Sequence, residues 1–168
     1  MANPLSMLGI IHTLFSIVPI VAGLHGFSRY GAIRAETRSG QVYLVFLGLS
    51  VVTSFGLSST GGFNAGHAIG ILSLLAVGAA LFLERSALFG SLNRYLSRLS
   101  MSFTFFLLMI PGINETLSRL PPANPIGQGP DSPAVQTATG IWLLIFLIGL
   151  CYQMWTMRRT PIPTMRPH

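Results

Sequence analysis

Five apolar segments dominate the chain, and each is close to the length that a helix needs to cross a bilayer. They run over residues 5–25, 42–58, 63–83, 99–113 and 139–157. A helix rises about 1.5 Å per residue, so roughly 20 residues cover a hydrocarbon core about 30 Å thick. The runs are continuous rather than alternating, which argues against a membrane β-barrel. We therefore expect an all-α bundle of five transmembrane helices that forms a single domain over residues 1–168.

The composition excludes an ordinary soluble protein. Of the 168 residues, 51% are hydrophobic and only 8% are charged, whereas a typical soluble domain is about 25% charged. So few charged side chains do not cover a water-exposed surface. The basic residues are all arginines, and they are dispersed between the apolar segments rather than gathered in one patch. This pattern is typical of a protein oriented in the lipid bilayer and disfavours binding to nucleic acid.

The arginines alternate between the two sides of the predicted bundle. Counted from the N-terminus, the six segments outside the spans hold 0, 3, 0, 3, 1 and 3 of them. Nine of ten fall on one side, which the positive-inside rule assigns to the cytoplasm. The sequence thus predicts an outside N-terminus and a cytoplasmic C-terminus. We also expect an irregular outside loop over residues 117–138, rich in proline and glycine, and an extended cytoplasmic tail over residues 158–168.

Two histidines inside the predicted spans form the candidate functional site. His12 lies about two turns from the outer end of the first span, and His67 about one turn from the outer end of the third. Each has a small residue on its own helix face, Ser16 at i+4 from His12 and Gly70 at i+3 from His67. Both rings should therefore point toward other helices at similar depth near the outer face. We expect the first and third spans to be adjacent and the two rings to approach each other.

Facing imidazoles suit several kinds of chemistry. Their nitrogens ligate haem iron or a divalent metal, so haem b between two helices and a metal site are two alternatives. A third alternative is that the two histidines hydrogen-bond a quinone head group. A fourth is that they are structural residues whose ring nitrogens bond to nearby hydroxyls and carbonyls. Glu115, at the outer end of the fourth span, is either a third member of this site or a helix-end residue at head-group level. We assign no catalytic residue, because the sequence contains no phosphate-loop, zinc-protease or serine-hydrolase motif.

Small residues in the second and third spans predict close helix packing. Gly66 and Gly70 form a GxxxG motif, Gly78 lies two turns further along the same stripe, and Ser50 and Ser54 are one turn apart in the second span. Such residues let helix backbones approach one another in lipid. Tight packing within one bundle is the simpler interpretation, and a homodimer face is the alternative.

Several short motifs lie between Ile11 and Pro121. They are His12, the segments RSGQVY (38–43) and FNAGH (63–67), Met101, and the segment NETL (114–117). With these motifs the chain resembles a family of uncharacterised bacterial integral membrane proteins that carry a domain of unknown function. The resemblance implies a multi-pass protein of the bacterial inner (plasma) membrane.

The histidine layout of that family is similar to that of two-haem cytochromes of the b561 type, which makes haem b a candidate cofactor. Two further histidines of the family pattern are replaced here by Thr37 and Ser97, while His12 and His67 are kept. The pair near the inner face is therefore missing. A single haem near one face does not carry electrons across the membrane.

Two functions remain open at this point. One is a small membrane protein that binds a cofactor or quinone through His12 and His67. The other is a non-catalytic accessory or assembly subunit that packs against a larger membrane complex through its glycine and serine faces. The expected partners are the lipid bilayer and either other membrane subunits or a second copy of the chain.

Overall fold

The computed structural model describes residues 6–57 and 62–159, and every regular element in these residues is a helix. The elements are α1 (Met7–Tyr30), α2 (Arg38–Ser54), the 3-10 turn η1 (Phe55–Leu57) that continues α2, α3 (Ala65–Arg85), α4 (Leu92–Arg119) and α5 (Pro133–Arg159). Five helices, with α2 and η1 taken together, are long and apolar enough to cross a membrane. The expected all-α class and the five helices of spanning length are confirmed.

Helices α4 and α5 extend beyond their apolar spans at both ends, and α1 and α3 extend beyond theirs at the C-terminal end, because polar turns continue them. The irregular loop expected over residues 117–138 is therefore shorter than predicted: α4 continues to Arg119 and α5 begins at Pro133, which leaves residues 120–132. Proline suits the first turn of a helix, where its missing N–H would have no partner. Arg158 and Arg159, expected in the extended tail, form the last turn of α5. Residues 5 and 58 of the predicted spans and the rest of the tail, 160–168, lie outside the described residues.

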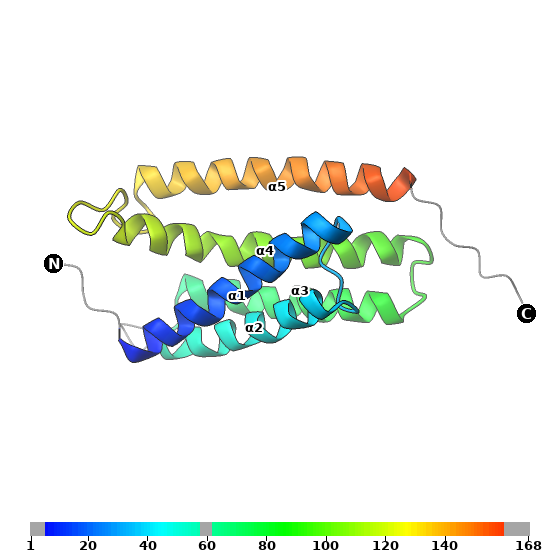
Figure 1. Cartoon of the computed structure of the whole chain (residues 1–168), viewed down its shortest axis with the longest axis horizontal. Coiled ribbons are helices and arrows are strands. Elements are labelled where there is room, and N and C mark those ends of the chain that lie inside the picture. Colours follow the sequence, from blue (N-terminus) through cyan, green and yellow to red (C-terminus); the bar gives the residue numbers. More distant parts are fainter. Residues whose placement is uncertain (1–5, 58–61, 160–168) are drawn as a thin grey trace, which may run out of the picture.

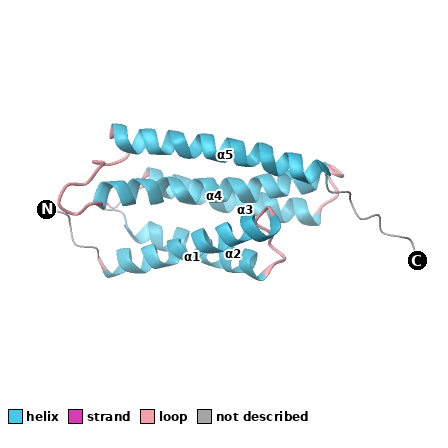
Figure 2. Cartoon of the chain, turned by 45° about the horizontal axis from the view of Figure 1, so that its top comes forward, coloured by secondary structure: helices cyan, strands magenta, loops and turns pink. Residues whose placement is uncertain are grey.

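Successive helices run in opposite directions, so the connections alternate between the two ends of the bundle (Figures 1 and 2). We call the end with the start of α1 and the α4–α5 loop the loop end. We call the other end, with the α1–α2 and α3–α4 connections, the arginine end. The described arginines of the arginine end are Arg29, Arg34, Arg38, Arg85, Arg94, Arg98, Arg158 and Arg159. Arg119 alone of the described arginines lies at the loop end, so the fold keeps the alternation seen in the sequence.

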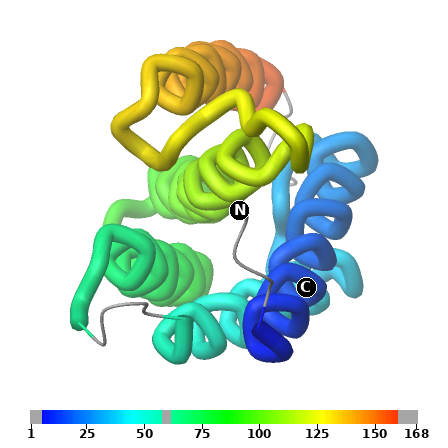
Figure 3. The backbone as a smooth tube through the Cα atoms, turned by 90° about the vertical axis from the view of Figure 1, so that its left-hand side faces the viewer, coloured from blue at the N-terminus to red at the C-terminus, as the bar shows by residue number. Residues whose placement is uncertain are grey.

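Helices α1 to α4 form a ring, and α5 lies outside it against α4 (Figure 3). The most extensive packing is between α1 and α2 and between α3 and α4. Only 6% of the most apolar stretch of α5 is buried, against 39% for α4. Helix α5 is held against α4 by aromatic contacts, such as the stacking of Phe106 on Phe146 with ring centroids 4.6 Å apart, and by polar contacts. Buried Gln153 accepts a hydrogen bond from Ser102 of α4 (2.9 Å) and donates to the carbonyl of Gly31 in the α1–α2 connection (3.1 Å).

The half of the bundle nearer the arginine end has a solid core. Its buried cluster is made of Ala22, Ile33, Tyr43, Leu47, Ala80, Met101, Phe105 and Leu108. The hydroxyl of Tyr43, which is fully buried, is hydrogen-bonded to that of Thr104 across the bundle at 2.7 Å. A buried phenol needs such a partner, because an unpaired polar group in an apolar interior costs about 1–3 kcal/mol. This half of the ring is closed by packed side chains.

Side-chain caps determine where three helices begin. Ser6 accepts a hydrogen bond from the backbone N–H of Gly9, and Thr37 accepts one from that of Gly40. Asn64 caps α3 in the same way. Each cap satisfies a backbone donor that the first turn leaves unpaired, typically worth about 1 kcal/mol. These residues explain why the three helices start two to four residues from the positions that hydropathy alone predicts.

Gly40 lies where the start of α2 touches the α1–α2 connection. A Cβ atom at this position would overlap the carbonyl oxygen of Arg34, which is backbone and has little freedom to move. We expect Gly40→Ala to lower the free energy of unfolding by about 1–3 kcal/mol through overpacking. The matched control is Gly78→Ala, because a Cβ at Gly78 meets no atom within 4 Å. Thermal unfolding in detergent measures both, and equal melting temperatures for the two variants would contradict this close approach.

Candidate functional site

A cleft of about 660 Å³ opens among α1, α2, α3 and α4 in the half of the bundle nearer the loop end. Its lining begins at that end with Ser6 and Asn64 and reaches Ile20 in α1. At about 1.5 Å per residue, this is a depth of roughly 20 Å along α1. The innermost lining includes Leu47 and Leu108, which also belong to the core cluster. The cleft therefore ends against the solid core of the arginine-end half.

The chemistry of the lining changes with depth. Charged and amide side chains surround the mouth: Asn64, Asn114, Glu115 and Arg119. Hydroxyls and imidazoles line the middle: His12, Thr13, Ser16, Ser50, Ser54, His67 and Ser73. The floor is apolar and is made of Ile20, Leu47, Leu107 and Leu108. A polar mouth above an apolar floor suits a molecule that is itself amphipathic.

The three residues expected to form the site, His12, His67 and Glu115, all line this cleft. The histidines do not pair directly, however. The expectation that the first and third spans are adjacent is wrong, because α2 lies between α1 and α3 in the ring (Figure 3). Nδ1 of His12 is 3.0 Å from Oγ1 of Thr53, and Nε2 of His67 is 3.1 Å from the carbonyl oxygen of Ser54. Two consecutive residues near the end of α2 therefore anchor the two rings.

His67 is a helix-capping residue whose two ring nitrogens are both used. Its Nδ1 accepts a hydrogen bond from the backbone N–H of Asn64 (3.3 Å), and its Nε2 donates to the carbonyl of Ser54. A backbone N–H only donates and a carbonyl only accepts, so these partners define a neutral ring with its proton on Nε2. The ring also stacks on Phe55, with centroids 4.7 Å apart. The Nδ1 lone pair, which iron or another metal needs, is occupied by the cap, so His67 does not fit a haem or metal ligand in this conformation.

A metal site also lacks further ligands here. Within residues 6–57 and 62–159, no group of three or more His, Cys, Asp and Glu side chains is placed to hold a metal ion.

His12 has the opposite arrangement, with one ring nitrogen left over. The hydroxyl of Thr53 directs its single proton at the carbonyls of Leu49 (2.8 Å) and Ser50 (3.0 Å) of its own helix. Thr53 therefore accepts from His12, which places a proton on Nδ1 of the imidazole. No hydrogen bond to Nε2 is found in the part of the chain that the structure describes. That nitrogen remains an acceptor in a ring that lines the cleft.

A pair of serines joins α1 to α2 in the middle of the cleft. Oγ of Ser16 and Oγ of Ser50 are 2.6 Å apart. The hydroxyl of Ser16 donates to the carbonyl of His12 (2.8 Å), so Ser50 must be the donor between the two serines. Ser50 keeps both of its lone pairs, because its oxygen accepts no other bond among the described residues.

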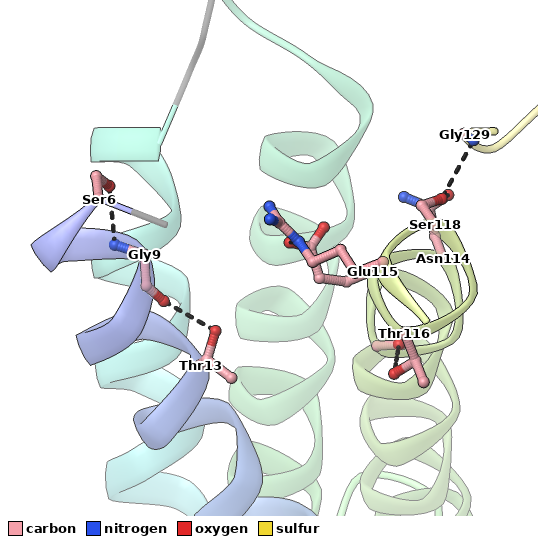
Figure 4. A network of polar contacts seen from close by, with 10 residues as sticks. Ser6, Gly9, Thr13, Asn114, Glu115, Thr116, Ser118 and Gly129 are labelled. Atoms are coloured by element: carbon pink, nitrogen blue, oxygen red, sulfur yellow. Dashed lines mark hydrogen bonds and ion pairs between the residues drawn. The ribbon is translucent and has the colours of Figure 1, made fainter. Parts of the chain in front are cut away.

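The mouth of the cleft carries an ion pair. Glu115 and Arg119, one turn apart on α4, are in direct contact, and their side chains are 50% and 40% exposed. Figure 4 shows the Glu115 side chain extending from α4 into the space between α4 and α1, where Thr13 lies on α1. Glu115 is thus both a residue of the last turns of α4 and a part of the cleft wall.

The predicted packing residues take different places. Gly70 lies at a close approach of α2 and α3, since a Cβ there would lie 3.0 Å from Cγ1 of Val51. Gly66 meets only the side-chain oxygen of Asn64, and Gly78 faces open space. Ser50 joins α1 to α2, whereas the Ser54 hydroxyl bonds within its own helix. Of the three glycines on this stripe, only Gly70 lies at a close approach of two helices of the chain.

Sequence reasoning missed the partners that hold the site. Asn64 stands three residues before His67, which is the spacing of a capping box, and this signal was available. Thr53 follows Ser50 by three residues on the same helix face, again a readable spacing. The pairing of each with a particular histidine required knowing which helices are neighbours.

Comparison with known proteins found no matching family model, no similar curated protein and no similar solved structure. The resemblance to a bacterial membrane-protein family therefore stays a prediction.

Removal of the His67 ring tests its structural role. We expect His67→Ala to lower the free energy of unfolding by about 2–3 kcal/mol, because it removes a cap and a buried hydrogen bond of about 1 kcal/mol each and leaves a carbonyl unpaired. His67→Gln should lose less, since its amide oxygen can still accept from the N–H of Asn64. Thermal unfolding in detergent is the measurement. An alanine variant as stable as the unmodified protein would contradict the capping role.

Proposed function

We propose that the chain is a multi-pass protein of the bacterial plasma membrane. It binds a small organic molecule in the cleft, and the mouth of the cleft opens to the outer side. The observation that supports this most is the asymmetry of the bundle. One half holds a cleft of about 660 Å³ and the other half a packed core. A cleft that is closed at its floor suits binding at one face rather than passage across the membrane.

The arginine distribution supports the orientation. All described arginines except Arg119 lie at the arginine end. The positive-inside rule places that end in the cytoplasm, so the mouth of the cleft faces outward. The N-terminus is then outside and the C-terminus inside.

The size and lining of the cleft support an organic ligand. Pockets for small molecules typically measure about 300–1,000 Å³ and combine apolar walls with a few polar groups. The apolar floor and the hydroxyls of the middle match this description. With both nitrogens of His67 engaged, the ligand is held by hydrogen bonds and apolar contacts rather than by coordination to a metal. The alternative of haem b is accordingly the weaker one.

Orientation is tested with a reporter fused after His168. We expect a reporter that is active only in the cytoplasm to give a full signal, and one that is active only outside the membrane to give none. The control is the same pair of reporters fused before Met1, which should behave in the opposite way. A strong outside signal from the C-terminal fusion would reject the orientation.

Access to the cleft is tested with two neighbouring cysteines. In a Cys151→Ala background, Thr13→Cys places a thiol on the cleft wall, and Leu14→Cys places one on the outward-facing surface of α1. We expect a charged, membrane-impermeant thiol reagent to label Thr13→Cys when added from outside and to leave Leu14→Cys unlabelled, because a thiol in lipid is poorly ionised.

The same reagent should not label Thr13→Cys from the cytoplasmic side of inverted vesicles, because the core closes the bundle there. Labelling from that side, or no labelling of Thr13→Cys from either side, would contradict the binding proposal. The accessory-subunit alternative would then be preferred.

A further inference from the structure

We propose that the ligand of the cleft carries a primary alkylammonium group, which binds to acceptors in the middle of the cleft. This inference rests on the proposed function and specifies the class of ligand.

The hydroxyl protons in the middle of the cleft are already used. Thr13 donates to the carbonyl of Gly9, Ser54 to that of Val51 and Ser73 to that of Ile69, at 2.7–2.8 Å. Ser16 donates its proton to the carbonyl of His12, and Ser50 donates its proton to Ser16. Hydroxyls in apolar helices commonly bond back to their own backbone in this way, which leaves oxygen lone pairs toward the interior.

The imidazole protons are used as well. The N–H of His67 goes to Ser54, and that of His12 goes to Thr53. What remains in the middle is a set of acceptors: Nε2 of His12 and the lone pairs of Ser50. Pro111 adds a further acceptor at the level of the floor, because it has no N–H and leaves the carbonyl of Leu107 without its usual intrahelical donor.

Donors in the lining occur at the mouth instead. They are the side-chain amides of Asn64 and Asn114 and the guanidinium of Arg119, which is paired with Glu115. A ligand whose polar atoms are all acceptors, such as a quinone, would leave its inner oxygens unpaired opposite other acceptors. A ligand that brings its own donors satisfies the site, and a primary ammonium brings three.

The charges near this position permit a cation. Glu115 balances Arg119 at the mouth, and His67 accepts a hydrogen bond at Nδ1 while it donates one from Nε2, which is the pattern of an uncharged ring. The apolar floor below the acceptors accommodates a hydrocarbon chain attached to the ammonium. The ammonium group thus matches the middle of the cleft, and the hydrocarbon chain matches its floor.

The test uses four probes of similar size with the protein in lipid nanodiscs and empty nanodiscs as the blank. n-Hexylammonium carries charge and three donors, and hexyltrimethylammonium carries charge without donors. Hexanol carries one donor without charge, and a short-chain benzoquinone carries acceptors alone. By calorimetry we expect n-hexylammonium to bind about tenfold or more tightly than each of the others, the range for a charged hydrogen bond.

Two variants locate the site. Ser50→Ala removes an acceptor oxygen from the middle of the cleft and should weaken n-hexylammonium binding several-fold. Ser28→Ala removes a hydroxyl that also donates to its own helix but lies outside the cleft, and it should change nothing. Equal affinities of these two variants would reject the assignment to the cleft.

The probe series on the unmodified protein is independent of how any variant folds. Equal binding of hexyltrimethylammonium would overturn the requirement for donors, and equal binding of hexanol the requirement for charge. Tighter binding of the benzoquinone would overturn the inference and leave the proposed function standing. Absence of n-hexylammonium binding in a protein whose Thr13→Cys variant is labelled from outside also overturns the inference alone.

Discussion

Polar groups buried among apolar helices must find their hydrogen-bond partners inside the protein, and much of the structure follows from this constraint. The backbone meets it by forming helices. The buried side chains meet it in pairs that join helices, such as Tyr43 with Thr104 in the core and Ser102 with Gln153 at α5. In the loop-end half the same rule makes the end of α2 the anchor of both histidines, since Thr53 and Ser54 offer the oxygens that the rings need.

The two halves of the bundle use their polar residues differently. In the arginine-end half they lie inside a packed core and join helices across the ring. In the loop-end half they line a cleft where hydroxyls such as those of Thr13 and Ser73 donate to their own helices, so these need no partner across the space. A helix ring can therefore stay open on one side without leaving unpaired donors. This division is what makes binding at one face the best-supported function.

Much of the fold was predictable because the signals are local. Hydropathy predicts the helices, and α4 shows its limit: it runs from Leu92 to Arg119, well beyond the apolar span over residues 99–113. Polar turns at helix ends carry no hydropathy signal, although caps such as Thr37 and Asn64 do mark them. The candidate site was predictable in part. Depth and face brought His12, His67 and Glu115 to one cleft, whereas their partners on α2 depend on which helices are neighbours.

The sequence by itself determined the number of helices of spanning length, the end of the bundle that carries the arginines and the position of each histidine along its helix. These follow from the apolar length and from residue spacing along single helices. The tertiary structure decided that α2 separates α1 from α3, and hence that each histidine bonds to α2 rather than to the other. It also decided that Gly70 meets Val51 while Gly78 meets nothing. Such outcomes depend on the order of helices around the ring, which no local pattern encodes because each helix presents several faces that could pack.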